Sequence, residues 1–264
     1  MDSSGEQQTS VFQREVNLFL IALTFLTRIP VPCKVNYSET QLNQSSRYFP
    51  YVGLLIGLLC AVVLGTTAQF LPMPVAVLLS MVFSLLLTGA FHEDGLADTC
   101  DGMGGGWTKE QVLTIMKDSR LGTYGAVGLV SVLALKAALL MSLPWQEGML
   151  ALIFAHGASR WLSVSYLIDL EYVRDIDSSK VKPLAQQLSL RDFAVASGIG
   201  VALLFLADGM LLVSAAGALL VFRMLFRKLL LRKLGGYTGD CLGAAQQISE
   251  VLIYLVWVLY VFQG

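Results

Sequence analysis

Residues 91–125 read FHEDGLADTCDGMGGGWTKEQVLTIMKDSRLGTYG, a stretch in which an apolar segment runs directly into clustered acids. If the stretch begins as a helix, Asp94, Asp98 and Asp101 fall at positions i, i+4 and i+7, which places their carboxylates on one helix face. Like charges this close repel one another unless a cation lies between them. Mg²⁺ is usually held by a few carboxylates together with substrate phosphates. The stretch therefore favours a magnesium site, with a solvated acidic loop as the ordinary alternative.

The composition is that of a membrane protein. The chain has 264 residues, of which 55% are hydrophobic and 14% are charged, whereas a soluble domain carries roughly 25% charged residues. The net charge of −1 leaves no broad basic surface, so nucleic acid is not expected as a partner. The four cysteines show no CxxC spacing, so they indicate neither a zinc site nor a disulfide framework. We expect an all-α integral membrane protein with the lipid bilayer as a partner.

Apolar segments recur along the chain and predict a polytopic transmembrane helical bundle of about seven spans (roughly six to eight). The segments are 16–32, 51–70, 75–91, 126–143, 149–168, 193–206, 210–222 and 251–262. The first is near the lower limit of about 17 residues for crossing, so it is either a tilted span or a re-entrant segment. Gly53 and Gly57 form a GxxxG pair that permits close helix contact. We assign 1–15 to a polar tail and 16–264 to a single integral-membrane catalytic domain.

The basic residues predict the orientation. If the spans alternate, one side of the membrane receives the four long polar loops, 27–50, 91–125, 169–192 and 223–247, which carry 15 of the 18 Lys and Arg residues. The short loops on the other side carry none. Because cytoplasmic loops are enriched in Lys and Arg, the long loops are expected in the cytoplasm. The acidic stretch would then share one face with a glycine-rich stretch near Asp240.

That second stretch, 235–240, reads GGYTGD and follows a strongly basic run. Its glycines permit positive φ and leave backbone N–H groups exposed, so Thr238 and Gly239 are candidates for phosphate binding and Asp240 for metal binding. A simple turn of the chain is an equally open interpretation. The basic run before it, 223–233, is typical of anchoring at the cytoplasmic end of a helix.

Four further side chains are candidates for binding or catalysis. Lys117 and Arg120 fall on one predicted helix turn and suit diphosphate oxygens, although an ordinary charged helix face is as compatible. Charged groups inside spans are costly and mark function by default, so Arg160 is expected to bind an anionic substrate. Lys136, also within a span, either snorkels or pairs with an acid.

The chain has two histidines. His92 adjoins the acidic cluster, where it would act as a base or hydrogen-bond a phosphate, and a plain interfacial histidine is the alternative. His156 lies in the middle of a predicted span and is expected to be a satisfied interior residue.

Clustered acids and nearby basic groups favour phosphoryl or nucleotidyl-diphosphate chemistry at a membrane surface. The run Asp94-Gly95-Leu96-Ala97 has a distant likeness to the CDP-alcohol phosphotransferase pattern, but Asp98 stands where that family has arginine. A lipid-head-group enzyme is therefore the second interpretation. The non-enzyme alternative is a small ion or metal transporter, which should place acids at the bilayer midplane. In this chain the acids singled out lie at span ends, which favours surface chemistry.

Several motifs in order resemble the cobalamin synthase family, the adenosylcobinamide-GDP ribazoletransferases. The motifs are LTRIP (26–30), FPYVG (49–53), HEDGLADTCDG (92–102), MKDSRLGTYG (116–125) and GGYTGDCLGAA (235–245). The resemblance covers nearly the whole chain after residue 16. It implies a transferase of vitamin B12 (cobalamin) biosynthesis in the bacterial cytoplasmic (inner) membrane, with its active site facing the cytoplasm. It also allows a homo-oligomer or association with other cobalamin-assembly enzymes.

The resemblance further implies a reaction and a set of roles. Adenosylcobinamide-GDP would react with α-ribazole or its 5′-phosphate to give adenosylcobalamin or its 5′-phosphate plus GMP, through attack of the ribazole 5′-hydroxyl on the diphosphate. The metal ligands for Mg²⁺ would be Asp94, Asp98, Asp101 and Asp240. The catalytic set would be His92, Asp94, Lys117 and Arg120, in which the two basic residues stabilise the leaving charge and an aspartate or His92 takes the proton. The residues expected to contact substrate phosphates are Arg28, Arg160, Thr238 and Gly239.

Overall fold

The protein is helical throughout the part of the chain that the structure describes. A computed structural model describes residues 11–31, 38–173 and 187–263. In chain order the helices are α1 (Val11–Leu26), α2 (Glu39–Ser45), η1 (Ser46–Tyr48), α3 (Phe49–Thr67), α4 (Met73–Thr88), α5 (Phe91–Gly105), α6 (Lys109–Lys117), α7 (Thr123–Met141), α8 (Trp145–Ser165), η2 (Tyr166–Ile168), α9 (Leu190–Ser197), α10 (Ile199–Leu203), α11 (Gly209–Lys233) and α12 (Gly239–Gln263). Extended pairing within those ranges is one isolated bridge between Tyr172 and Tyr237. The predicted all-α fold is confirmed. Much of the predicted tail and of two predicted loops (1–10, 32–37 and 174–186) lies outside the described residues.

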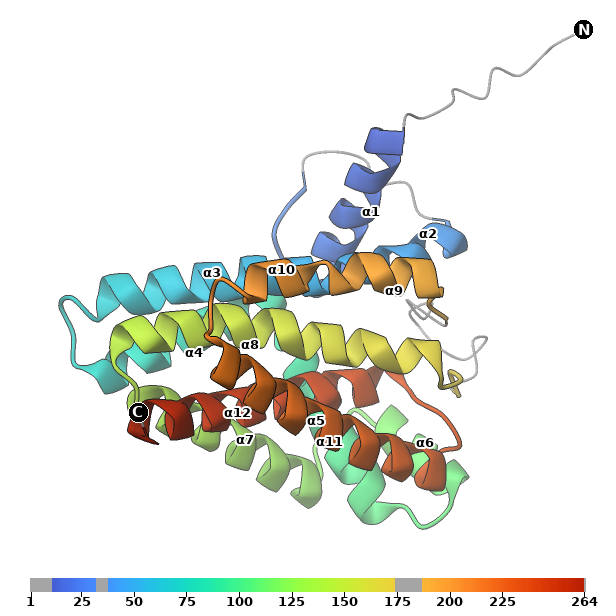
Figure 1. Cartoon of the computed structure of the whole chain (residues 1–264). Coiled ribbons are helices and arrows are strands. Elements are labelled where there is room, and N and C mark those ends of the chain that lie inside the picture. Colours follow the sequence, from blue (N-terminus) through green and yellow to red (C-terminus); the bar gives the residue numbers. More distant parts are fainter. Residues whose placement is uncertain (1–10, 32–37, 174–186, 264) are drawn as a thin grey trace, which may run out of the picture.

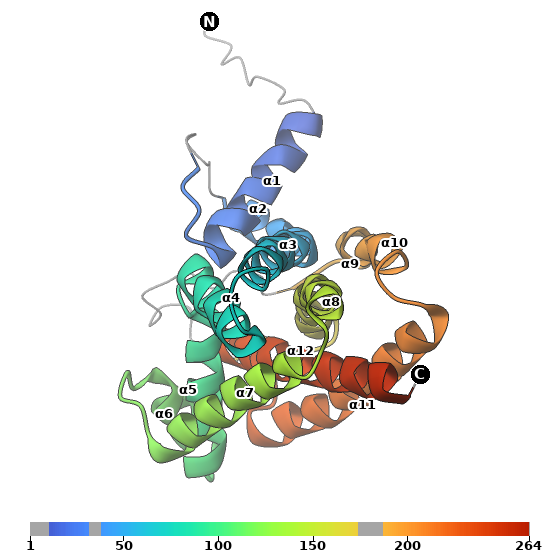
Figure 2. The same ribbon diagram turned by 90° about the vertical axis from the view of Figure 1, so that its left-hand side faces the viewer.

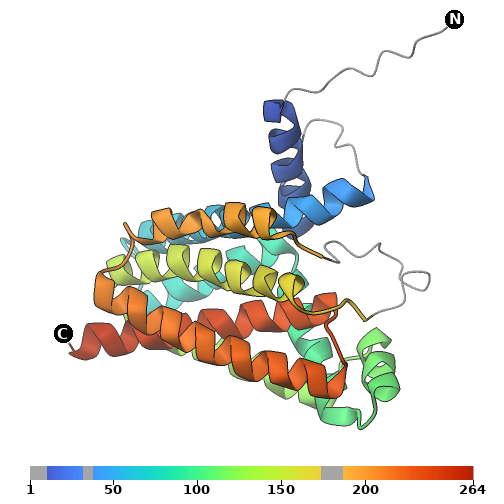
Figure 3. The ribbon, with the colours of Figure 1, turned by 45° about the vertical axis from the view of Figure 1, so that its right-hand side comes forward.

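Most of the long helices run side by side as an elongated bundle (Figure 1). Seen end-on, α8 lies near the centre, between α3 and α12 (Figure 2). The short connections between α3 and α4 and between α7 and α8 lie at one end of the bundle, and α2, α6 and the start of α12 lie at the other. α1 points away from the bundle (Figure 3). The polar segments therefore gather at one end, as the distribution of Lys and Arg predicted.

The outer helices present apolar side chains to the surroundings. In the most apolar 18-residue segment of α7, only 17% is buried inside the protein. The corresponding value for α11 is 22%. Val130 on α7 and Leu225 on α11, for example, are largely exposed. Exposing apolar surface to water costs roughly 25 cal/mol per Å², whereas lipid tails cover it without that cost. These helices are those of a membrane protein.

Fewer helices meet the criteria for a span than the roughly seven predicted. Among the described residues four helices are long and apolar enough to cross a membrane, or up to five if the bent pair of α4 and α5 is one span. α1 and α4 have only 16 residues each. The predicted span 193–206 is broken near Gly198 into α9 and α10. α8 has 21 residues, but His156 and Arg160 lower its apolar average.

A sharp elbow joins α4 to α5. The two helices are bent by 88°, because Gly89 and Ala90 both adopt the left-handed conformation, with φ of 69° and 57°. Glycine takes this conformation freely, but a residue with a Cβ loses roughly 1–2 kcal/mol there. The elbow places α5 across the end of the bundle rather than along it. The acidic stretch is thus carried on a separate helix.

The GxxxG pair on α3 makes the close contact that the sequence predicted. A Cβ added to Gly53 would lie 2.2 Å from the carbonyl oxygen of His156, and one added to Gly57 would lie 2.7 Å from that of Leu152. Both carbonyls belong to α8, so the backbones of α3 and α8 touch at these positions. The absence of side chains on the glycines therefore sets the position of α8, including Arg160 one turn further on.

Three helix boundaries predicted from the sequence need correction. The final helix was predicted at 251–262, but α12 begins at Gly239, so residues 239–250, which were expected to precede the helix, form its first three turns. The span predicted at 210–222 continues as α11 to Lys233, which makes the basic run the end of one long helix. In both cases polar residues at the ends of an apolar segment hid the continuation of the helix. α1 likewise begins at Val11, within the predicted polar tail.

Candidate active site

The acidic stretch forms a helix, as its spacing predicted. Asp94 and Asp98 lie one turn apart on α5, where Asp94 is exposed and Asp98 is half-buried. Asp94 also lines an open pocket together with Arg28 of the LTRIP motif. The guanidinium of Arg28 lies against the elbow, so close that a Cβ on Gly89 would lie 2.3 Å from its Nε atom. One pocket therefore holds a candidate metal ligand and a candidate phosphate-binding arginine.

Asp101, the third acid of the stretch, is turned towards the protein. Its two carboxylate oxygens accept hydrogen bonds from the backbone N–H groups of Gly122 and Gly125, each at 2.8 Å. These N–H groups lie at the start of α7, where helix donors lack partners within the helix. Asp101 therefore caps α7. Any metal contact would use the remaining lone pairs of the same oxygens.

The fourth candidate ligand reaches the acidic helix through a close crossing of α5 and α12. A Cβ on Gly95 would lie 2.9 Å from the carbonyl oxygen of Asp240, and one on Gly243 would lie 3.1 Å from that of His92. Asp240 is in the first turn of α12. The two small residues thus bring it beside the helix that carries Asp94 and Asp98. Thr238, just before α12, is fully buried, with its hydroxyl 3.4 Å from a carboxylate oxygen of Asp240.

The basic pair predicted to stabilise the leaving charge is not on one helix turn. α6 ends at Lys117, because Asp118 takes an extended conformation with ψ of 121°. Arg120 follows in the loop to α7 and hydrogen-bonds the Asp118 carboxylate, with Nη2 at 2.6 Å. These bonds lower the pKa of Asp118 below its ordinary value and raise the pKa of Arg120. Both Lys117 and Arg120 are exposed, close along the chain to the cap at Asp101.

His92, Arg160 and Gly239 line one mainly apolar cavity, which the sequence did not indicate. His92 is buried, and its ring contacts that of Phe91 edge-on, with centroids 5.5 Å apart. Phe91 also lines the open pocket of Arg28 and Asp94. The two hollows are therefore neighbours, one apolar and one polar.

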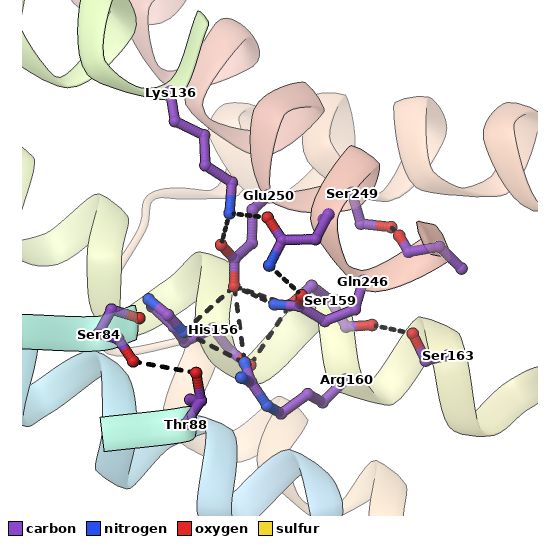
Figure 4. Close-up of polar contacts among 12 residues, drawn as sticks. Ser84, Thr88, Lys136, His156, Ser159, Arg160, Ser163, Gln246, Ser249 and Glu250 are labelled. Carbon is purple, nitrogen blue, oxygen red and sulfur yellow. Dashed lines mark hydrogen bonds and ion pairs between the residues drawn. The ribbon is translucent and has the colours of Figure 1, made fainter. Parts of the chain in front are cut away.

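Four charged or polar side chains meet inside the bundle, and we call Lys136, His156, Arg160 and Glu250 the buried charge cluster (Figure 4). The Nζ atom of Lys136 lies 2.5 Å from one Glu250 oxygen. The other Glu250 oxygen lies 3.1 Å from Nδ1 of His156 and 3.5 Å from Nη1 of Arg160. All four side chains are at most 8% exposed. Lys136 therefore pairs with an acid, one of the two predicted alternatives, and His156 is a satisfied interior residue, as predicted.

Sequence reasoning missed Glu250 and gave no role to Glu93. Glu250 follows Gln246 and Gln247 on one face of α12, and Gln247 donates a hydrogen bond of 2.8 Å to Glu93. The available signal was this i, i+1, i+4 polar pattern immediately before an apolar segment. It was overlooked because the helix was expected to begin at 251. Glu93 and Glu250 are buried within the bundle, so the acids of this chain do not all lie at span ends, as would be expected of a surface enzyme.

The predicted magnesium ligands are all oxygen donors of the kind that suits this ion. Asp94, Asp98 and Asp240 come from two helices that touch, which fits a shared cation. Within the described ranges, no group of three or more His, Cys, Asp or Glu side chains lies close enough together to hold a metal ion. The donors fit magnesium by type and come from helices in contact, but their side chains do not form a closed set.

Comparison with known proteins shows to which protein family this chain belongs. The profile of the family described as cobalamin-5-phosphate synthase matches residues 18–258. A Vibrio cholerae protein named adenosylcobinamide-GDP ribazoletransferase is 48% identical over 95% of this chain and 97% of its own length. Proteins of the same name from Shewanella frigidimarina and Shewanella sp. (strain ANA-3) are 50% and 48% identical, over 92% and 93% of this chain and 94% and 95% of their own. No solved structure matches this chain.

The helical fold and the charged end of the bundle therefore belong to a membrane-embedded transferase of cobalamin synthesis. The chain belongs to the cobalamin-5-phosphate synthase family. This membership decides against the CDP-alcohol phosphotransferase and transporter alternatives.

Proposed function

We propose that this protein joins adenosylcobinamide-GDP to α-ribazole, or to α-ribazole 5′-phosphate, and releases GMP. The products are adenosylcobalamin or its 5′-phosphate. The name of the relatives supports these substrates. The observation in this molecule that carries the proposal is the crossing of α5 and α12, which sets Asp240 beside the helix of Asp94 and Asp98. Acids so gathered suit a reaction on a diphosphate.

The nucleophile in this proposal is a secondary ribose hydroxyl, which corrects the 5′-hydroxyl expected from the resemblance. The family description names a cobalamin 5-phosphate as the product. In such a product the 5′ oxygen is already esterified, so it is not available to attack the diphosphate. The attacking oxygen forms a bond to the phosphorus on the cobinamide side, and the bond from that phosphorus to the GMP oxygen breaks. The hydroxyl proton passes to a nearby base.

Asp94, Asp98 and Asp240 would hold Mg²⁺, with Asp101 contributing only through lone pairs that its bonds to α7 leave open. When bound, the ion neutralises charge on the diphosphate. Arg28, on the wall of the same pocket as Asp94, is suited to bind phosphate oxygens. Thr238 and Gly239 help by positioning Asp240 at the start of α12.

The remaining candidate residues accept the proton of the attacking hydroxyl and stabilise the charge on the leaving GMP. Asp94 or His92 accepts the hydroxyl proton, since both adjoin the wall shared by the two hollows. Lys117 and Arg120 stabilise the charge that develops on GMP. Arg120 would exchange its Asp118 partner for the phosphate, which its exposure permits.

The proposed function also requires a location in the cell. The enzyme lies in the bacterial cytoplasmic membrane with its active site towards the cytoplasm, because the polar end of the bundle carries the basic residues. A second copy of the chain, or other enzymes of cobalamin assembly, would associate with it there.

The test is a transfer assay on the full chain in nanodiscs. Adenosylcobinamide-GDP, α-ribazole and Mg²⁺ are supplied, and GMP and the new corrinoid are followed by chromatography. We expect product in equal amount with GMP, loss of both on adding EDTA, and recovery on adding excess Mg²⁺. Transfer that survives EDTA contradicts the magnesium assignment. Folded protein that releases no GMP under conditions in which a relative does so contradicts the function.

A further inference from the structure

The apolar cavity next to the acidic helix has walls that suit a flat ring. Phe25 of α1, Phe49 of α3 and Phe91 of α5 contribute three aromatic side chains to it. Phe25 stacks on Phe49 with centroids 5.7 Å apart and meets Phe91 edge-on at 5.1 Å. Aromatic rings prefer such offset and edge-to-face arrangements, which a further ring can extend. The cavity therefore favours an aromatic occupant over a charged one.

One polar group in the wall of this cavity lacks a partner. Arg160 is 3% exposed, and its Nε atom has no hydrogen-bond partner among the described residues. Its Nη1 atom, by contrast, donates to the carbonyl oxygen of His156 at 2.9 Å and faces Glu250. Glu250 is the acid that Arg160 shares with Lys136. The buried Nε–H group calls for an acceptor, and the mainly apolar walls suit a neutral acceptor better than a phosphate.

The place of the cavity indicates which part of a substrate it would take. Phe25 and Phe91 line both this cavity and the polar pocket of Arg28 and Asp94. The cavity has a volume of about 60 Å³. A bicyclic ring fits only if its sugar-bearing edge lies in the mouth. The ribose would then lie towards the acids, where a hydroxyl is needed.

We propose that this cavity binds the aromatic base of the ribazole substrate, with Nε of Arg160 donating a hydrogen bond to the free ring nitrogen of the base. The inference rests on the proposed function. A benzimidazole whose other nitrogen carries the sugar has one in-plane acceptor and no N–H, so it can accept from the unpaired Nε of Arg160 without bringing a donor of its own. Guanine would bring several polar groups against apolar walls, where they would lack partners. Arg160 is therefore a residue for recognition of the base, not for phosphate binding.

The test compares two ligands of equal size that differ in this acceptor. 1-Methylbenzimidazole has the ring nitrogen, and 1-methylindole has a C–H in its place. Calorimetric titration of the full chain in nanodiscs should show 1-methylbenzimidazole binding about tenfold more tightly, the effect of one buried hydrogen bond. In Arg160→Lys, which keeps a cation beside Glu250 but lacks Nε, the two affinities should become equal.

A second variant keeps the inference testable if Arg160→Lys does not fold. Leu242 lines the cavity, so Leu242→Phe should weaken the binding of both ligands about equally. Leu220→Phe, on the exposed face of α11, is the matched control and should leave both affinities unchanged. Equal affinities in the wild type, or unchanged binding in Leu242→Phe, would overturn the proposal.

The outcomes for the cavity and for the reaction are separable. A protein that transfers but does not distinguish the two ligands contradicts the cavity assignment alone. A protein that distinguishes them but releases no GMP contradicts the proposed function, and leaves a benzimidazole-selective cavity.

Discussion

Two groups of charged residues in this protein differ mainly in how much water surrounds them. At the polar end of the bundle, Asp94 and Arg120 are exposed and change partners cheaply. Inside the bundle, Lys136 and Glu250 are paired at 2.5 Å with almost no exposure. Exposed ion pairs contribute roughly 0–1 kcal/mol to stability, whereas removing one partner of a buried pair costs about 3–5 kcal/mol. The exposed group is thus free to carry chemistry, and the buried group fixes the helices that carry it.

The largest effect is expected from breaking the buried charge cluster. Glu250→Gln leaves Lys136 and Arg160 as two buried cations without their shared acid, so stability should fall by about 3–5 kcal/mol. Lys136→Met should cost clearly less, because Arg160 still balances Glu250. Unfolding by SDS in mixed micelles measures both. Adding Lys136→Met to Glu250→Gln should restore part of the stability, and equal losses in the two single variants would contradict this account.

At the exposed group the expected loss is in activity rather than in stability. Asp94→Asn removes a charge from the proposed metal site, so kcat/KM for transfer should fall about 10²–10³-fold. Because Asp94 is exposed, the free energy of unfolding should change by no more than about 0.5 kcal/mol. Glu110→Gln, an exposed acid on α6 outside the site, is the control. An Asp94→Asn enzyme with full activity would remove Asp94 from the metal set.

The contact that positions the buried cluster gives an intermediate effect. In Gly53→Ala the new Cβ would meet the backbone of α8 next to His156, so the helices must separate, at about 1–3 kcal/mol. Gly217→Ala is the matched control, since nothing lies within 4 Å of a Cβ there. SDS unfolding of both variants distinguishes close packing from a general effect of replacing a membrane glycine. Equal stability in the two variants would show that the crossing tolerates a methyl group.

The smallest effect on stability is expected for the exposed pair of Asp118 and Arg120. Asp118→Asn should leave the free energy of unfolding unchanged at neutral pH, since the pair is surrounded by water. The bonds to Arg120 hold the pKa of Asp118 low in the folded protein, so any contribution is present at neutral pH and is lost as the pH falls through that pKa. Arg120→Ala should nevertheless slow transfer. A measurable loss of stability at pH 7 in Asp118→Asn would mean that the loop is more ordered than its exposure implies.

Three features could be predicted from the sequence: the membrane-protein class, the helical acidic stretch and the GxxxG contact. Each of these depends on composition or on spacing within one segment, which is the information that a linear pattern contains. The spacing of Asp94 and Asp98 needed only that α5 be a helix. The motifs also indicated the family, because their order along the chain is itself a sequence property.

Which side chains of different helices lie next to one another could be seen only in the folded protein. Lys136, Arg160 and Glu250 come from three different helices, so no spacing could reveal that they meet. The same holds for the Asp101 cap of α7, which gives a predicted metal ligand a structural contact as well. It also holds for the cavity built by Phe25, Phe49 and Phe91. The physical reason is that the charge, shape and solvation of a site depend on helices that pack together from distant parts of the chain, whereas the sequence records only which residue types each helix contributes.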